Sequence, residues 1–394
     1  MELSIAIISL GIVITFSYLA TMLGSKIRIP SVVLLIALGI LIRYLSNWAG
    51  LAIPELKLLI SILGTIGLLL IVLEASLEIR IDRSNIGVFL QALIAALFVI
   101  GLTTTAIYTS LWILFNFQGK SVLLASIALS IMSSAVTIPS ITGFDERSKL
   151  FLTLESAFSE VLGVLAFNFV QSTEEFQLSE TGTFFGEIGM TVVVSLVGVV
   201  CLVWILKVNK SKIRYFAILG IVLIMYGIGK LYHLPVLVLI VFFGLFLANF
   251  PKIREKIRWR FVKGIDLDQE VQRFEEMNNE ISFIVRTFFF VVFGMQLDLF
   301  RLASIRSIQI ALVILPIMYL SRSMAILPLA RTNLGKIVLT APRGLITILL
   351  FYQIVFLPSE ARLVDIMYIS IIASVLIMTF VVLFSRDSSR SDIL

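Results

Sequence analysis

Two glutamates lie within a stretch of the chain that is long and apolar enough to cross a bilayer. Residues 151–170 read FLTLESAFSEVLGVLAFNFV and carry Glu155 and Glu160. A charge at bilayer depth costs at least about 2.5–3.5 kcal/mol on insertion scales, so such residues normally face a bundle interior or a water-filled path. A buried carboxylate can hold a proton or a metal cation, but hardly both together. Glu155 and Glu160 are therefore the first candidates for a functional site.

Helical geometry predicts different surroundings for the two glutamates. Five residues correspond to about 140° around an α-helix, so their side chains point to different faces. Glu155 shares a face with Ser159, and Glu160 shares one with Ser156, because residues four apart are neighbours on a helix. One glutamate can therefore be structural while the other is functional.

Arginines within other apolar stretches are the expected partners. A rise of 1.5 Å per residue places Glu155, Arg322 and Arg343 at similar depth, roughly 9–14 Å into the membrane, with Glu160 deeper. We expect Glu155 to pair with Arg322, with Arg343 as a further candidate, because an unpaired buried charge is very costly. Glu160 is then the carboxylate that exchanges a proton for a cation. The alternative is that all these charges form inert salt bridges between helices.

Two apolar stretches are poorly built as continuous helices. In residues 122–141, Pro139 removes a backbone donor and strains the preceding turn. Its neighbours include hydroxyls that can satisfy freed backbone groups or bind ions: Ser130, Ser133, Ser134, Thr137 and Ser140. Residues 340–345 read TAPRGL, which places Arg343 in a second break. Broken helices in corresponding halves of a chain indicate a transport site, although a single break can be an ordinary proline kink.

The composition predicts an all-α polytopic membrane protein. Of 394 residues, 59% are hydrophobic and 14% charged, whereas soluble domains carry about 25% charged residues. Runs of about 20 apolar residues span a bilayer as helices, which pair their own backbone groups. The thirteen predicted spans are 3–23, 29–46, 58–76, 87–115, 122–141, 150–170, 185–206, 214–229, 235–250, 282–299, 303–329, 337–356 and 364–385.

The lysines and arginines predict the orientation of these spans. Twenty-one of the 31 fall on the side that includes the loop after the first span, and seven on the other side. Positive residues favour the cytoplasm, so we expect the N-terminus outside and the C-terminus inside. The same bias explains the net charge of +6 without a nucleic-acid partner. The loop 251–281, basic and then acidic, is either an anchor at the membrane surface or a regulatory contact with anionic lipid.

Other features narrow the function. Residues 72–79 and 292–299 are loosely similar and would run in opposite directions, as in the inverted repeats of secondary transporters. Cys201 stands alone, so it offers neither a disulfide nor a metal cluster. A lone His233 is no basis for a metal site, which usually needs three or four ligands. We expect that the protein uses no cofactor and is not an enzyme, because the sequence resembles neither a nucleophile–base set nor a phosphate-binding loop.

At these residues the chain resembles the cation–proton antiporter superfamily, in particular its sodium/proton exchanger branch. The family's sixth span carries Glu-Ser-x-x-Asn-Asp, where this chain has Glu155-Ser156-Ala-Phe-Ser159-Glu160. Residues 285–294, VRTFFFVVFG, are similar to the segment before the family's second repeat core.

The second half of the chain extends the resemblance. The family's arginine in span 11 matches Arg322, and its Arg-Gly in the second broken helix matches Arg343-Gly344. The chain departs from the family where Ser159-Glu160 replaces Asn-Asp. It also departs where Ser133 and Ser134 stand in place of the frequent Thr-Asp of span 5, as in the serine-rich potassium-efflux branch.

The resemblance implies an architecture and a mode of action. Spans 1–3 (1–84) and 8–10 (213–300) would form a panel that dimerises. Spans 4–6 (85–172) and 11–13 (301–386) would form a core that moves like an elevator, joined by a linker (173–212) and followed by a tail (387–394). The acid of span 6 would carry the ion and the proton, and Glu155 and Arg322 would form a structural ion pair.

We therefore predict an electroneutral exchanger of a monovalent cation, Na⁺ or K⁺, for H⁺ in a bacterial inner membrane. The predicted ion and proton ligands are Glu160, Ser159, Ser156, Ser133, Ser134 and Thr137. One alternative is a transporter of another solute, such as an organic anion neutralised by Arg322 and Arg343. A second is a membrane scaffold or sensor that does not transport.

Overall fold

A computed structural model places most of the predicted helices. It describes residues 11, 14–20, 22–23, 29–48, 67, 69–74, 76–77, 79, 86–141, 143–172, 178–208, 215–232, 234, 236–257, 267–297, 302, 304–329 and 333–384. His233, the tail 387–394, the middle of the 251–281 loop and most of spans 3–23 and 58–76 lie outside the described residues.

All regular structure in the described residues is helical, which confirms the predicted all-α class. The elements are α2 (Ser31–Trp48), α4 (Ile86–Phe115), α5 (Lys120–Ser130), α6 (Ser134–Ser140), α7 (Glu146–Ser172), α8 (Leu178–Val208), α9 (Tyr215–Leu231), α10 (Val236–Ile257), α11 (Leu267–Gln296), α13 (Ile305–Ile326), α14 (Leu334–Leu339), α15 (Leu345–Phe351), η3 (Pro358–Glu360) and α16 (Arg362–Phe384).

Six helical segments of the described chain are long and apolar enough to cross a membrane. These are α2, α4, α5 and α6 taken together, α7, α13 and α16. Shorter apolar helical stretches occupy Gly189–Ile205, Ile218–Leu231 and Val236–Phe250. The thirteen-span count itself stays a prediction.

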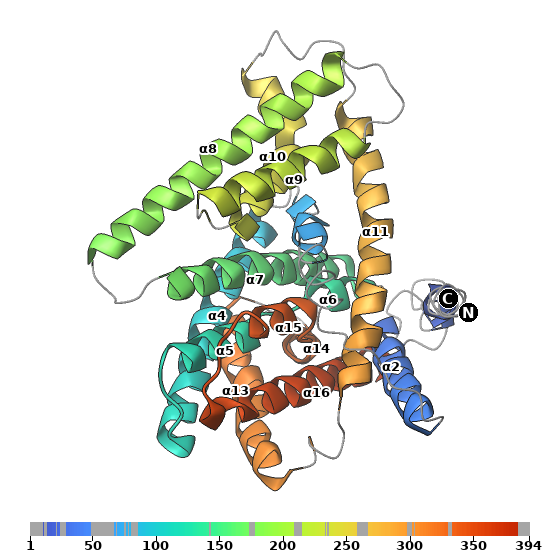
Figure 1. Ribbon diagram of the computed structural model, residues 1–394, viewed down its shortest axis with the longest axis vertical. Coiled ribbons are helices and arrows are strands. Elements are labelled where there is room, and N and C mark those ends of the chain that lie inside the picture. Colours follow the sequence, from blue (N-terminus) through green and yellow to red (C-terminus); the bar gives the residue numbers. More distant parts are fainter. Residues whose placement is uncertain are drawn as a thin grey trace. The chain divides into compact units, whose positions relative to one another are not determined.

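The chain divides into two compact units. The first comprises Met1–Leu68, Gly87–Gly163 and Phe283–Leu394, and the second comprises Leu69–Ile86 and Val164–Ser282. In the second unit α8, α9 and α10 pack against one another (Figure 1). The Ser195 hydroxyl of α8 donates to the carbonyl of Leu239 in α10 at 2.8 Å.

The first unit contains both broken helices. Residues 131–133 separate α5 from α6, with Ile131 and Ser133 in extended conformations. Residues 340–344 separate α14 from α15. The first break lies before the position that Pro139 predicts, because α6 continues across that proline. The breaks meet where the Ser133 amide donates to the Pro342 carbonyl at 2.9 Å.

The other helices of the first unit surround these breaks. Helix α15 packs on α5, and α16 contacts α13, α14, α15, α5 and α6 (Figure 1). Two glycines allow close approach at the crossing. A Cβ on Gly344 would lie 2.6 Å from Ser133 Oγ in the other break, and a Cβ on Gly163 of α7 would collide with Ile131 in the first break. The unit therefore forms a polar crossing flanked by α7, α13 and α16.

Candidate functional site

Helix α7 carries four buried polar side chains, of which Ser159 and Glu160 contact the first break. Glu155, Ser156, Ser159 and Glu160 are each at most 2% exposed. The helix begins with an N-terminal cap, in which the Ser148 amide donates to Asp145 Oδ2 at 3.0 Å. This cap fixes where α7 begins.

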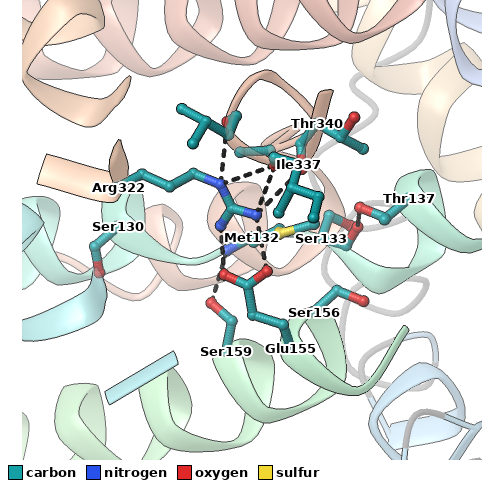
Figure 2. A network of polar contacts seen from close by, with 12 residues as sticks. Ser130, Met132, Ser133, Thr137, Glu155, Ser156, Ser159, Arg322, Ile337 and Thr340 are labelled. Atoms are coloured by element: carbon teal, nitrogen blue, oxygen red, sulfur yellow. Dashed lines mark hydrogen bonds and ion pairs between the residues drawn. The ribbon is translucent and has the colours of Figure 1, made fainter. Parts of the chain in front are cut away.

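Glu155 and Arg322 form a bidentate ion pair (Figure 2). Arg322 Nη1 donates to Glu155 Oε1 at 2.6 Å, and Nη2 donates to Oε2 at 2.8 Å. Both side chains are 1% exposed. Arg322 also donates to the carbonyls of Ile337 and Val338, each at 3.1 Å. The guanidinium thus joins α7 to the C-terminal end of α14, where unpaired carbonyls carry partial negative charge.

Arg343 lies on backbone carbonyls. Its Nε donates to Leu129 O at 2.8 Å, its Nη1 to Ala341 O at 2.7 Å and its Nη2 to Ser130 O at 3.4 Å. It therefore occupies the C-terminal end of α5, as Arg322 occupies that of α14. The sequence makes Arg343 a further candidate partner of Glu155, but its guanidinium binds these backbone carbonyls instead. The carbonyls need such donors because the helix break leaves them without an amide partner.

Glu160 lies at the N-terminus of α6. The Ser134 amide donates to Glu160 Oε1 at 2.8 Å, and the Ser134 hydroxyl donates to Oε2 at 2.6 Å. A carboxylate is stabilised there because the first amides of a helix lack intrahelical acceptors and carry partial positive charge. The two glutamates thus face different partners, as their spacing predicts.

Ser159, beside Glu160, binds the same break. Its hydroxyl oxygen accepts a hydrogen bond from the Met132 amide at 2.9 Å (Figure 2). Ser159 and Glu160 therefore hold the amides on the two sides of Ser133. This pairing explains why the chain unwinds at 131–133 although Pro139 lies further along.

The remaining predicted ligands are arranged differently. The Ser156 hydroxyl donates to Thr153 O at 3.0 Å, and the Thr137 hydroxyl donates to Ser133 O at 2.7 Å. Ser133 Oγ is buried and has no hydrogen-bond partner among the described residues. It points toward the second break, since it lies beside Gly344. Among the predicted hydroxyls, that of Ser134 donates to Glu160.

The crossing also uses hydroxyls that the sequence analysis did not select. The Ser374 hydroxyl accepts a hydrogen bond from the Arg343 amide at 2.9 Å, and the Thr347 hydroxyl donates to Ala128 O at 3.0 Å. Ser370 and Ser374 stand four residues apart in an apolar stretch. That spacing places the two serines on one helical face and is the signal that could have identified Ser374.

The arrangement suits reversible binding of a small cation. Carboxylate and hydroxyl oxygens are the ligands that hard cations prefer. An ionised carboxylate offers about four lone-pair sites, and Ser134 uses one on each oxygen. In the described part of the chain, no group of three or more His, Cys, Asp or Glu side chains is placed to hold a metal ion. Glu160 and the Ser134 hydroxyl that donates to it supply oxygens of this kind at the first break.

Comparison with known proteins agrees with this geometry. The transmembrane sodium/hydrogen exchanger family matches residues 11–385. No curated protein sequence matches the chain.

The fold is similar to that of the sodium proton antiporter MjNhaP1 from Methanocaldococcus jannaschii. Its structure at pH 8 has a TM-score of 0.75 and 18% identity, over 96% of this chain and 100% of that one. An electron-microscopy structure of the same antiporter has a TM-score of 0.71 and 17% identity, over 97% and 96% of the two chains. The match over nearly the whole sequence confirms the resemblance found from its motifs: this chain belongs to the sodium/hydrogen exchanger family.

Proposed function

We propose that this integral membrane protein exchanges a monovalent cation, Na⁺ or K⁺, for H⁺, with Glu160 as the shared site. The family supports cation/proton exchange. One observation carries the site assignment: Glu160 is buried at the start of α6, where Ser134 is its partner, whereas Arg322 engages Glu155. Glu155 and Arg322 then form the structural pair.

Competition for the Glu160 oxygens couples the two ions. A proton on Glu160 neutralises the carboxylate, and the Ser134 hydroxyl can turn to accept that proton's hydrogen bond. A cation at the same oxygens is also met by a lone pair of the hydroxyl oxygen, with the hydroxyl hydrogen turned away from the ion. The proposed shell consists of Glu160 with the hydroxyl oxygens of Ser133, Ser134, Thr137, Ser156 and Ser159. Since one carboxylate carries either ion, the exchange is electroneutral.

The proposed domain motion, pairing of copies and orientation are those expected for the family. The core (85–172 and 301–386) carries the site and moves like an elevator against the panel (1–84 and 213–300), through which two copies pair. The N-terminus lies outside and the C-terminus in the cytoplasm of a bacterial inner membrane; a reporter fused to the C-terminus tests this orientation. The organic-anion alternative is weakened because carboxylate and carbonyl oxygens already occupy Arg322 and Arg343.

Glu160→Gln tests the site. The amide cannot ionise, so we expect exchange to fall to the background of empty liposomes. The measurement uses proteoliposomes with an internal pH dye, to which Na⁺, K⁺ or Li⁺ is added. The matched control is Glu146→Gln, an exposed carboxylate on the same helix, which should exchange normally. Full activity in a folded Glu160→Gln protein would reject the assignment.

A further inference from the structure

A partly buried contact ties the beginning of α5 to the segment before α16. The Ser121 hydroxyl, in the first turn of α5, donates to Glu360 Oε2 at 2.8 Å. The same oxygen accepts the Leu357 amide at 2.9 Å, and Glu360 is only 3% exposed. A buried carboxylate with two donors is costly to separate from them.

A second contact ties the beginning of α14 to the segment before α7. Asn333, which caps α14, donates from Nδ2 to Asp145 Oδ1 at 2.9 Å. Asp145 Oδ2 accepts the Ser148 amide. Burial raises the pKa of the Asp145 carboxyl, but the hydrogen bonds from Ser148 and Asn333 outweigh it and bring this pKa below its ordinary value. Asp145 therefore stays ionised at cellular pH, and the contact persists there.

The two contacts occupy corresponding positions in the two halves of the chain. In each, an acid stands just before the helix that follows a broken pair: Asp145 before α7 and Glu360 before α16. In each, the partner stands at the start of the other half's first broken segment: Asn333 at α14 and Ser121 at α5. Since α5 and α6 together span the membrane, Ser121 and Asp145 belong to opposite ends of the first unit.

These contacts complete the anchoring of two short helices. Helix α5 has 11 residues and α14 has 6, and isolated helices of this length are marginal in water. Arg343 holds the carbonyl end of α5, and Arg322 holds that of α14. The Glu360 and Asp145 contacts hold the opposite ends.

We propose that Glu360 and Asp145 are positioning residues for exchange. Each fixes the outer end of the other half's broken helix, so that the ends meeting at the crossing stay in register while the site changes its access. This inference rests on the proposed function. The Ser121–Glu360 contact lies away from Ser134, since Ser121 is in the first turn of α5 and about ten residues of helix, roughly 15 Å at helical rise, separate it from the first break.

Removing the partner of each acid gives the sharpest test. Asn333 has a φ of 57°, so Asn333→Gly keeps this backbone conformation and removes only the amide side chain. Its matched control is Asn116→Gly, because Asn116 has a φ of 56° and an exposed side chain outside these contacts. Ser121→Ala removes the other donor, and its control is Ser323→Ala, because Ser323, like Ser121, is a half-buried serine but bonds within its own helix.

We expect Asn333→Gly and Ser121→Ala each to lower the maximal exchange rate per folded protein about fivefold, which is the change in rate when the activation free energy rises by about the net value of one hydrogen bond. The half-saturating cation concentration should not change, because the Glu160 partners are intact. Glu360→Gln should retain the rate, since an amide oxygen can accept both bonds, and Glu360→Ala should lose it. Rates equal to those of the two controls, or a loss of stability alone, would overturn the proposal.

Hydrogen exchange separates this proposal from the proposed function. Amides of α5 should exchange faster in Ser121→Ala, and those of α14 faster in Asn333→Gly, whether or not the protein transports ions. A wild-type protein that moves no protons in response to cations would refute the exchanger function alone. Unchanged amide exchange in both variants would refute the positioning role alone. Should Glu360→Ala fail to fold, the serine and glutamine variants still decide the outcome.

Discussion

At the scale of single residues, two glutamates of one helix differ because their partners differ. Arg322 gives Glu155 a bidentate guanidinium, whereas Ser134 gives Glu160 an amide and a hydroxyl. A guanidinium has only donors, in a fixed planar fork, so it holds both oxygens of Glu155 in one geometry. A hydroxyl can both donate and accept, so it can follow a change in the ligand of Glu160. This difference underlies the assignment of Glu155 to structure and Glu160 to exchange.

The ion pair should respond unequally to loss of either partner. Arg322→Ala leaves Glu155 buried without its two donors and removes the donors of Ile337 O and Val338 O. We expect it to cost about 3–5 kcal/mol, as for other broken buried pairs. Glu155→Ala leaves the guanidinium on its carbonyl acceptors and should cost less. Thermal unfolding in detergent measures both.

The control for this comparison is Arg306→Ala, since Arg306 is an exposed arginine of the same helix and should have little effect. Equal losses from Glu155→Ala and Arg322→Ala would show that the carbonyl contacts contribute nothing. A greater loss from Glu155→Ala would contradict the argument.

At the scale of elements, the breaks decide what the helices can bind. A continuous helix uses its amides and carbonyls internally, and an interrupted one presents them at bilayer depth. In this protein the carbonyls left without helical partners bind arginines, and the amides left without helical partners bind Ser159 and Glu160. Opposite ends of the half-helices thus meet opposite charges.

Gly344 should be intolerant of a side chain. A Cβ there would lie 2.6 Å from Ser133 Oγ and 2.8 Å from Ser133 Cβ, so Gly344→Ala must displace one break from the other. We expect a loss of about 1–3 kcal/mol, typical of overpacking, and slower exchange. Ser133→Gly in the same chain should restore part of the stability. Unfolding temperatures in detergent and the pH-dye assay give the two readouts.

Gly335→Ala is the matched control, because a Cβ at Gly335 in α14 would meet nothing within 4 Å. It should be neutral or stabilising by up to about 1 kcal/mol, since alanine favours helix over glycine. Should Gly344→Ala be as well tolerated as Gly335→Ala, the two breaks do not depend on this close contact.

At the scale of the whole molecule, the two arginines of the crossing have partners within the protein. Glu155 and Arg322 neutralise each other, and Arg343 lies on carbonyl ends. In the proposed cycle, a cation or a proton binds the Glu160 carboxylate. The site then carries the same net charge with either ion, which is the proposed physical basis for one-for-one exchange.

Electroneutral exchange predicts no transport current. Proteoliposomes held at different membrane potentials should show the same exchange rate, because no net charge crosses the membrane in a full cycle. The measurement combines the pH dye with a clamped potential, and Glu160→Gln liposomes supply the background. A current that rises and falls with the exchange rate would contradict the one-carboxylate account.

The sequence by itself determined the helical membrane fold, since long apolar runs and their buried charges are local properties of the chain. It also predicted the pairing of Glu155 with Arg322, 167 residues apart, because few residue types satisfy a charge at that depth. Only the tertiary structure decided that Arg343 binds carbonyls, that Ser134 binds Glu160 and that the first break precedes Pro139. Every residue has a carbonyl and almost every one an amide, so their directions at a helix end are set by packing rather than by residue type.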